Sequence, residues 1–367
     1  MLTSIITPLA IGTILGCINK INNIIKDNNT EQKTKEQWKE FLDSVQIQNK
    51  AKQSLCFVSN EEDCILFRCP YGISEEDIKS KEVYFKKFLN ATRVEYEIKD
   101  IWLKMNYYKD ELPEKIEFKL PNIKSTDIQV VLGESYSQQA IINFNKTPHV
   151  LLAGATNSGK SITTHVILLQ LYLCCRDIEF YLADMKKVEL INYKNLTQTK
   201  RYVDNLDGVK DVVSELLEEC DRRYELIGKL GCKKMETYNK KVNKNNKLNP
   251  IVFVVEECVR LVSDKNLQKD LAELLFIGRA CGIYIILTIQ RPTVKCISPE
   301  IKASLGNIIG LKTVNKRNSE AICDDMRLKS LRGFGHGWLF NDFGEVEYQG
   351  YFINENDIDE YLKVLDK

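Results

Sequence analysis

Four apolar runs, separated by stretches with helical periodicity, dominate residues 150–289 of the chain. The runs are residues 150–153, 178–183, 251–255 and 283–289, and nearly every position in them is apolar. A strand with one solvated face alternates apolar and polar residues, whereas a strand buried on both faces has this continuous pattern. Helices between such strands cover both faces of a parallel sheet. The pattern predicts an α/β domain over residues 121–367.

Residues 55–120 have a different pattern, with short strand-like runs on either side of one helix-like stretch. Ser74 can cap this helix, and Asp77 is three residues later. The apolar side chains that fall close to one face of the helix are Ile78, Phe85, Phe88 and Leu89. The pattern predicts one amphipathic helix packed on strands, as a small α+β domain that precedes the larger one.

The first 19 residues contain no charged side chain. Crossing a bilayer takes about twenty apolar residues, and Pro8 with several hydroxyl side chains makes this segment marginal. Lys20 and Lys26 would favour a cytoplasmic position for the remainder of the chain. A membrane anchor and a buried or interfacial helix both remain open. Residues 20–54 are rich in Asn, Lys, Gln and Glu, which predicts a solvated helix or linker.

Overall composition does not identify a partner. The chain has 52 Lys+Arg and 51 Asp+Glu, so the net charge is +1 and any contact with DNA must come from locally placed residues. The 12 cysteines form no CxxC pair and lie mostly in apolar runs. That spacing predicts buried thiols in a reducing compartment, and it argues against a zinc site or a disulfide framework.

A phosphate-binding loop comes directly after the first apolar run. Gly154 and Gly159 bound the loop, and Lys160 with Ser161 completes the P-loop pattern G-x-x-x-x-G-K-[ST]. Backbone N–H groups of such a loop point at phosphate oxygens, the lysine reaches the β- and γ-phosphates, and the serine hydroxyl binds Mg²⁺. The residues that we expect to contact ATP are Gly154, Ala155, Thr156, Asn157, Ser158, Gly159, Lys160, Ser161 and Thr163.

Polar side chains also stand at the ends of two later runs. Glu256 and Glu257 come directly after residues 251–255, and Gln290 comes after residues 283–289. A nucleotide hydrolase needs one carboxylate for Mg²⁺ and a second to orient or deprotonate the attacking water. A side-chain amide beside them can report whether the γ-phosphate is present. The carboxyl ends of parallel strands meet at one edge, so we expect these residues beside the P-loop.

Several further segments carry a specific resemblance. Residues 182–190 (LADMKKVEL), 220–242, 278–292 (GRACGIYIILTIQRP) and 330–340 (SLRGFGHGWLF) are similar to blocks of the FtsK/SpoIIIE family of hexameric DNA translocases. The resemblance extends over about residues 130–352. It implies a RecA-like P-loop motor that uses ATP and Mg²⁺ and acts as a homo-oligomeric ring, with a hexamer expected.

The resemblance also implies roles for individual residues. Lys160, Glu257 and Gln290 match the phosphate-binding, water-activating and sensor positions, and Ser161 with Glu256 would hold Mg²⁺. These assignments predict ATP hydrolysis. In place of Glu256 the family usually has Asp, and the extra methylene shifts the carboxylate relative to the octahedral shell of magnesium, which would slow hydrolysis.

Two further functions depend on the ring. Arg279 matches the arginine that reaches the nucleotide of the neighbouring subunit, where a guanidinium stabilises charge on the transferring phosphoryl group. Arg291, Lys302 and Lys316 fall in or near the loops that face the pore in this family. They would contact phosphates of double-stranded DNA, which is a sequence-independent mode of binding.

The sequence favours a double-stranded DNA pump of the short type that resembles TcpA-like conjugative coupling proteins of mobile elements. Such a pump would work with a relaxase and membrane transfer-channel proteins. It would lie at the cytoplasmic face of the membrane if residues 1–19 insert, and in the cytoplasm if they do not. Two alternatives remain open. One is a type VII-like protein-secretion ATPase, and the other is a nucleotide-gated adaptor without turnover, for which Glu256 is the only support.

Overall fold

The computed structural model describes residues 34–122, 125, 127–290 and 299–364. The chain divides into two compact units, with the boundary between Glu111 and Leu112. This boundary precedes the one expected at residue 120. Residues 1–19, for which the sequence leaves a membrane anchor open, lie outside the described residues. Among the helices of the described part, none is long and apolar enough to cross a membrane.

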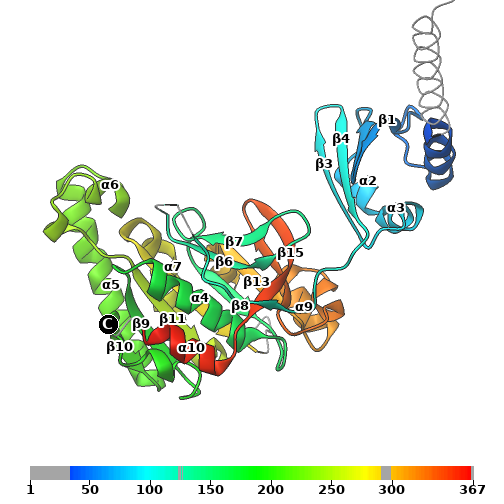
Figure 1. The fold of residues 1–367 in the computed structure, drawn as a ribbon. Helices are drawn as coiled ribbons and strands as arrows, with labels where there is room; N and C mark the ends of the chain where they lie inside the picture. Colours follow the sequence, from blue (N-terminus) through cyan, green and yellow to red (C-terminus); the bar gives the residue numbers. More distant parts are fainter. Residues whose placement is uncertain (1–33, 123–124, 126, 291–298, 365–367) are drawn as a thin grey trace, which may run out of the picture. The chain divides into compact units, whose positions relative to one another are not determined.

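Unit 1, which ends at Glu111, is an antiparallel sheet covered on one face by helices (Figure 1). The strand order is β1-β2-β4-β3. Its elements are a helix over residues 34–45, β1 (Cys56–Glu61), β2 (Cys64–Arg68), α2 (Glu75–Lys79), α3 (Glu82–Leu89), β3 (Arg93–Lys99) and β4 (Trp102–Tyr108). The small α+β domain predicted from the sequence is confirmed.

Two details of unit 1 differ from the prediction. The sequence predicts a single helix after Ser74, but the structure has two, α2 and α3. The helix is interrupted at Ser80 and Lys81, where the Ser80 hydroxyl donates a hydrogen bond to the carbonyl of Asp77. The Ser74 cap is present and forms a reciprocal capping box with Asp77. Residues 34–45 are helical but not solvated throughout, since Trp38 packs in the core with Phe67 in edge-to-face contact.

Unit 2 contains a mostly parallel sheet with helices on both faces (Figure 1). Its strands are β5 (Ile116–Glu117), β6 (Gln129–Glu134), β7 (Gln139–Asn143), β8 (Val150–Ala153), β9 (Glu179–Asp184), β10 (Thr199–Val203), β11 (Ile251–Glu256), β12 (Ile283–Ile289), β13 (Asn307–Leu311), β14 (His336–Asn341) and β15 (Gly344–Phe352). Its helices are α4 (Lys160–Cys174), α5 (Leu206–Lys229), α6 (Met235–Asn239), α7 (Lys265–Cys281), α8 (Pro299–Ser304), α9 (Lys316–Cys323) and α10 (Glu355–Leu362).

The strand order explains why the apolar runs are continuous. Strands β10-β9-β11-β12-β8-β13 are parallel neighbours, and β14, β15, β6 and β7 extend the sheet antiparallel. In β8, Leu151 and Ala153 pack with α5 and α7, whereas Val150 and Leu152 pack with α4 and α10. Both sets of side chains are therefore buried. All four predicted strands are present, and the fold is the predicted P-loop-type α/β fold.

The cysteines are only partly as expected. Cys69, Cys220, Cys258 and Cys281 are buried, whereas Cys56 and Cys174 are exposed. Each cysteine of the described residues is a free thiol. Apolar neighbours in the sequence did not predict the exposure of these two thiols. Cys56 is the first residue of an edge strand and Cys174 the last residue of a helix, and both positions are open to solvent.

Candidate nucleotide-binding site

The P-loop turns sharply between β8 and α4. Gly159 has φ +100°, which disfavours any residue with a Cβ. A Cβ built there would lie 2.4 Å from the backbone nitrogen of Gly335, because that N–H donates to the carbonyl of Ser158 at 2.8 Å. The loop before β14 thus packs directly on the P-loop, and glycine at 159 permits the contact.

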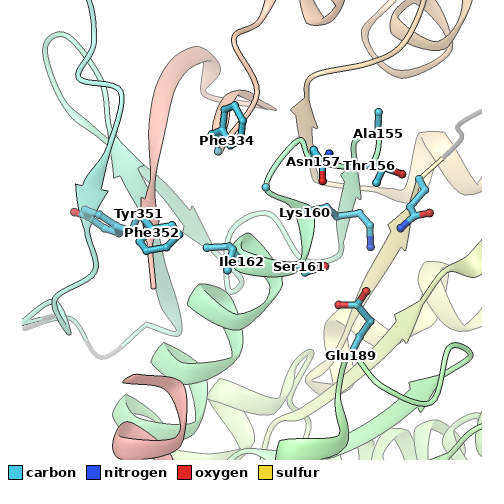
Figure 2. Close-up of a pocket in the computed structure, with 13 residues that line it drawn as sticks. Ala155, Thr156, Asn157, Lys160, Ser161, Ile162, Glu189, Phe334, Tyr351 and Phe352 are labelled. Atoms are coloured by element: carbon cyan, nitrogen blue, oxygen red, sulfur yellow. The ribbon is translucent and has the colours of Figure 1, made fainter. Parts of the chain in front are cut away.

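A cavity of about 360 Å³ lies over the start of α4. Figure 2 shows that its labelled side chains separate into two ends. Lys160, Ser161 and Glu189 form a polar end next to the P-loop, and Phe334, Tyr351, Phe352 and Ile162 surround the other end. The chemistry of the two ends suits a phosphate chain and a flat aromatic base, respectively. The remaining lining residues are Ala155, Thr156, Asn157, Gly159, Gln290 and Gly335.

The Lys160 ammonium is buried beside the ends of two strands. It contacts a carboxylate oxygen of Glu256 and lies 3.3 Å from the Thr288 hydroxyl oxygen. The Thr288 hydroxyl donates to the other Glu256 oxygen and accepts the backbone N–H of Glu257 at 3.1 Å. A buried charge is stable when it is paired and fully hydrogen-bonded. Thr288 supplies these bonds between β11 and β12.

Lys186 places a second ammonium among three carboxylates. Its Nζ atom lies 3.3 Å from Glu189, 3.8 Å from Glu256 and 3.9 Å from Glu257. Glu257 adopts the left-handed conformation, φ 61° and ψ 58°, and its buried Oε2 atom has no hydrogen-bond partner among the described residues. Strained backbone and unsatisfied polar atoms cluster at functional sites. The carboxylate is thus placed to accept a hydrogen bond from a bound molecule.

Glu189 is held in its charged form. Burial acts to raise the pKa of its carboxyl group, but the Ser161 hydroxyl and the ammonium groups of Lys186 and Lys160 outweigh burial and hold the pKa below its usual value. Ser161, Glu189 and Glu256 together offer a hydroxyl and carboxylate oxygens, the donor set that Mg²⁺ prefers. These residues therefore fit a magnesium ion beside the phosphates.

Three residues expected to contact ATP do not line the cavity. Thr163 turns its hydroxyl back to the carbonyl of Gly159 at 3.0 Å. Ser158 is buried, and a Cβ on Gly154 would lie 2.5 Å from its hydroxyl oxygen. Gly154 and Ser158 therefore pack against each other within the P-loop instead of lining the cavity. Gln290 does line the cavity, as the sensor position would require.

The residues expected to act in the ring lie away from this cavity. Arg279 is exposed at the carboxyl end of α7, and its guanidinium donates to the carbonyl of Lys146 at 2.8 Å. Lys146 shortly precedes β8, so Arg279 lies at the end of the sheet where the parallel strands begin, and the P-loop lies at the end where they finish. Lys302 pairs with Asp324 at 3.1 Å, and Lys316 lies 3.6 Å from Glu320 with its side chain 57% exposed. Arg291 lies outside the described residues.

Sequence reasoning missed three members of the site, namely Lys186, Glu189 and Thr288. A signal existed for each of them. Lys186 and Glu189 come soon after β9, at the same edge as the P-loop, and Thr288 is a polar residue in an apolar strand.

The sequence pattern of the FtsK/SpoIIIE family matches residues 122–329, more than half of the chain. This chain belongs to the FtsK/SpoIIIE family. The match includes the P-loop, Glu256 and Glu257 at the end of β11, and Arg279. The chain is thus a member of a nucleotide-binding ATPase family.

Curated members of the FtsK/SpoIIIE family are similar over the same region. The DNA translocase FtsK of Treponema pallidum (strain Nichols) is 31% identical over 250 residues, which are 63% of this chain and 30% of that protein. The DNA translocase SpoIIIE of Bacillus subtilis (strain 168) is 29% identical over 272 residues, 70% of this chain and 34% of that protein. The chain therefore spans about a third of the length of these relatives.

Solved structures support the fold. The pCW3 conjugation coupling protein TcpA, in its monomer form with ATPγS, has a TM-score of 0.65 and 22% identity, and the match covers 90% of this chain and 99% of TcpA. EssC (ATPases 2 and 3) from Geobacillus thermodenitrificans has a TM-score of 0.64 and 16% identity, covering 70% of this chain and 52% of that chain. At these identities the likeness establishes the fold alone.

Proposed function

We propose that this chain is an ATP-dependent translocase of double-stranded DNA that acts as a ring, in conjugative or mobile-element DNA transfer. The observation that carries the proposal is the cavity over the P-loop, which Glu189 lines and whose Lys160 contacts Glu256, in a family with curated members named DNA translocases. The fold likeness to a conjugation coupling protein over almost its whole length supports the choice of transfer system.

ATP would bind with its phosphates at the polar end of the cavity. Lys160 would then exchange Glu256 for phosphate oxygens, since an ammonium that loses a buried partner needs another. Ser161 and Glu256 would hold Mg²⁺, with Glu189 nearby, and the ion would neutralise charge on the phosphates. Glu257, whose buried Oε2 atom has no hydrogen-bond partner among the described residues, would accept a proton from the attacking water.

The base would lie at the aromatic end. Phe334 is 78% exposed and borders the cavity opposite Phe352, so its ring has an open face for stacking. Gln290 lies at the phosphate end and would register the γ-phosphate. The nucleotide would thus bridge β15 and the P-loop.

Assembly into a ring would supply two features that a single subunit lacks, an arginine at the nucleotide site and a positively charged channel. Arg279 lies at the opposite edge of the sheet from the P-loop, so its guanidinium would serve the site of a neighbour. A ring would also bring Arg291, Lys302 and Lys316 of all subunits to a shared channel, which concentrates positive charge in a protein with a net charge of +1. We further propose a hexamer that works with a relaxase and membrane transfer-channel proteins.

ATP hydrolysis measured with and without duplex DNA, over a salt series, tests the proposal. We expect duplex DNA of any sequence to stimulate hydrolysis, and stimulation to fall steeply with salt because phosphate contacts release counterions. Arg291→Ala combined with Lys316→Ala should weaken stimulation and reduce the salt slope by about 2, close to one unit for each lost contact. Lys229→Ala is the matched control, since Lys229 forms a similar exposed pair with Glu225.

Three outcomes separate the alternatives. No stimulation by DNA at low salt in a confirmed ring would contradict the translocase. Retained ATP binding without turnover would then favour the nucleotide-gated adaptor. Turnover stimulated by a protein substrate would favour a type VII-like secretion ATPase.

A further inference from the structure

The sheet of unit 1 has one covered face and one open face. Ile65, Phe67, Leu103 and Met105 point to the covered face, and each is fully buried against the helices. The residues that alternate with them in β2 and β4 point the other way and are exposed or half-buried. Within the described part of unit 1, all helices contribute to the core on the covered side. The opposite face is therefore open to a partner.

Strand register brings four side chains of the open face together. Trp102 of β4 pairs with Arg68 of β2 on one side and with Lys99 of β3 on the other. Lys104 is two residues further along β4, on the same face. Neighbouring strands are about 4.8 Å apart and alternate residues about 7 Å apart, so the four side chains form one small surface. We name Arg68, Lys99, Trp102 and Lys104 the Trp102 patch.

Exposure distinguishes Trp102 from the other two tryptophans of the chain. Trp102 is 42% exposed, whereas Trp38 and Trp338 are 3% and 7% exposed. An exposed aromatic side chain surrounded by charged residues is typical of a binding surface. Trp102 contributes nothing to the core of unit 1, so folding of this unit does not explain its presence.

The three positively charged side chains of the Trp102 patch are available to contact a ligand. In the described residues, Arg68, Lys99 and Lys104 form no ion pair, whereas Arg93 at the far end of the same face lies 3.9 Å from Glu95. One acid, Glu97, lies directly across from Lys104 in the register without contacting it. The patch therefore combines an indole face with three positive charges that form no ion pair among the described residues, and Glu97 is the carboxylate directly across from Lys104.

We propose that the Trp102 patch binds single-stranded nucleic acid. An unpaired base would stack on the indole of Trp102, and the backbone phosphates on either side would meet Arg68, Lys99 and Lys104. Single strands are the occupant that this chemistry fits, because stacking requires a base free of its complement, and paired bases expose only edges. The surface is distinct from the nucleotide cavity and requires neither ATP nor the proposed duplex channel.

Tryptophan fluorescence of the whole chain, titrated with oligo(dT) of about 20 nucleotides without ATP, tests the proposal. We expect oligo(dT) to quench the emission of the one exposed tryptophan, and Trp102→Phe to remove the quenching while leaving emission of the buried pair. Trp102→Ala should weaken binding about 5- to 100-fold, measured by anisotropy of labelled oligo(dT). Arg68→Ala with Lys104→Ala should reduce the salt slope by about 1.4, at 0.7 for each lost contact.

Matched variants make the test specific. Tyr71→Ala removes an exposed aromatic side chain, and Lys79→Ala an exposed lysine on α2, and neither should change binding. Glu97→Gln should tighten binding about 2- to 5-fold, because it removes the carboxylate that opposes Lys104. This gain cannot arise from a folding defect.

Four results would overturn the proposal. They are quenching that persists in Trp102→Phe, affinity for oligo(dT) that Trp102→Ala leaves unchanged, tighter binding of a matched duplex at the patch, and a change of oligomeric state as the main effect of the patch variants. The last result would show that the open face of unit 1 binds a second copy of the chain.

Discussion

At the scale of single residues, the site is a balance of two buried or half-buried ammonium groups against three carboxylates. Lys160 and Lys186 both lie near the same carboxylate oxygen of Glu256, Oε1, and Lys186 also lies near Glu257 and Glu189. Each lysine is held by groups that a bound nucleotide and Mg²⁺ would also contact. Binding of ATP and Mg²⁺ would therefore compete with these pairs.

Glu257→Gln tests the role of the Glu257 carboxylate. The amide has nearly the same shape but does not accept a proton from water, so ATP should still bind while hydrolysis falls about 10²- to 10⁴-fold. Lys160→Ala should instead abolish turnover by removing the phosphate contact. Equilibrium binding of a fluorescent ATP analogue and steady-state phosphate release measure the two effects. Glu225→Gln, on an exposed face of α5, is the control, and near wild-type turnover by Glu257→Gln would remove Glu257 from catalysis.

At the scale of elements, a buried histidine ties β8 to β12 and α7. His149 precedes β8, is 1% exposed, and its Nδ1 atom accepts the backbone N–H of Ile285 at 3.1 Å. Burial lowers the pKa of His149 to about 4, and the nearby charge of Arg279 acts in the same direction, while the Leu275 backbone opposes it. The neutral imidazole is thus part of the fold.

This depressed pKa predicts a stability change in acid. Between pH 6.5 and 4 the unfolded chain binds a proton at His149 that the folded chain does not, so the free energy of unfolding falls as pH falls through this window. The contribution of His149 is about 3 kcal/mol and is fully present above pH 6.5.

Urea unfolding at pH 7 and pH 4.5 measures the effect in wild type and in His149→Asn, which keeps an acceptor for Ile285 without titrating. The variant should lose less stability between the two pH values. His165, whose pKa burial also lowers to about 4, contributes equally to both proteins and cancels. Equal losses in the two proteins would contradict the assignment.

At the scale of the whole molecule, the nucleotide cavity and Arg279 lie at opposite edges of one sheet. Such a subunit offers an arginine at one edge and a nucleotide at the other, which suits a ring in which each subunit completes the site of the next. Hydrolysis would then depend on assembly.

Mixed rings test this dependence. Arg279→Ala subunits retain a P-loop, and Lys160→Ala subunits retain the arginine, so mixing the two inactive proteins should restore part of the activity where a functional pair meets. An arginine supplied in trans contributes about 10³- to 10⁵-fold in related chemistry, so rescue should be well above background. ATP hydrolysis by rings of verified mixed composition gives the answer. Mixing Arg279→Ala with itself is the control, and absence of rescue would exclude action in trans.

The sequence by itself determined the features that depend on neighbouring residues. Both the strands β8, β9, β11 and β12 and the P-loop could be predicted, because burial on two faces and phosphate binding each leave a pattern within a short stretch. The Ser74 cap and the carboxylates at the end of β11 were likewise visible, since each is defined by its position relative to one element. The roles proposed for these side chains remain predictions.

Only the tertiary structure decided which distant residues meet. Thr288 joins Lys160 to Glu256, and Gly335 packs on Gly159, although long stretches of chain separate the partners. Lys302, expected to contact DNA, pairs with Asp324, the residue that follows α9, and Trp38 enters the core of unit 1 from a segment whose composition is polar. The physical reason is the same in each case. Contacts between elements depend on how strands order in a sheet and which faces pack, and local periodicity carries no information about either.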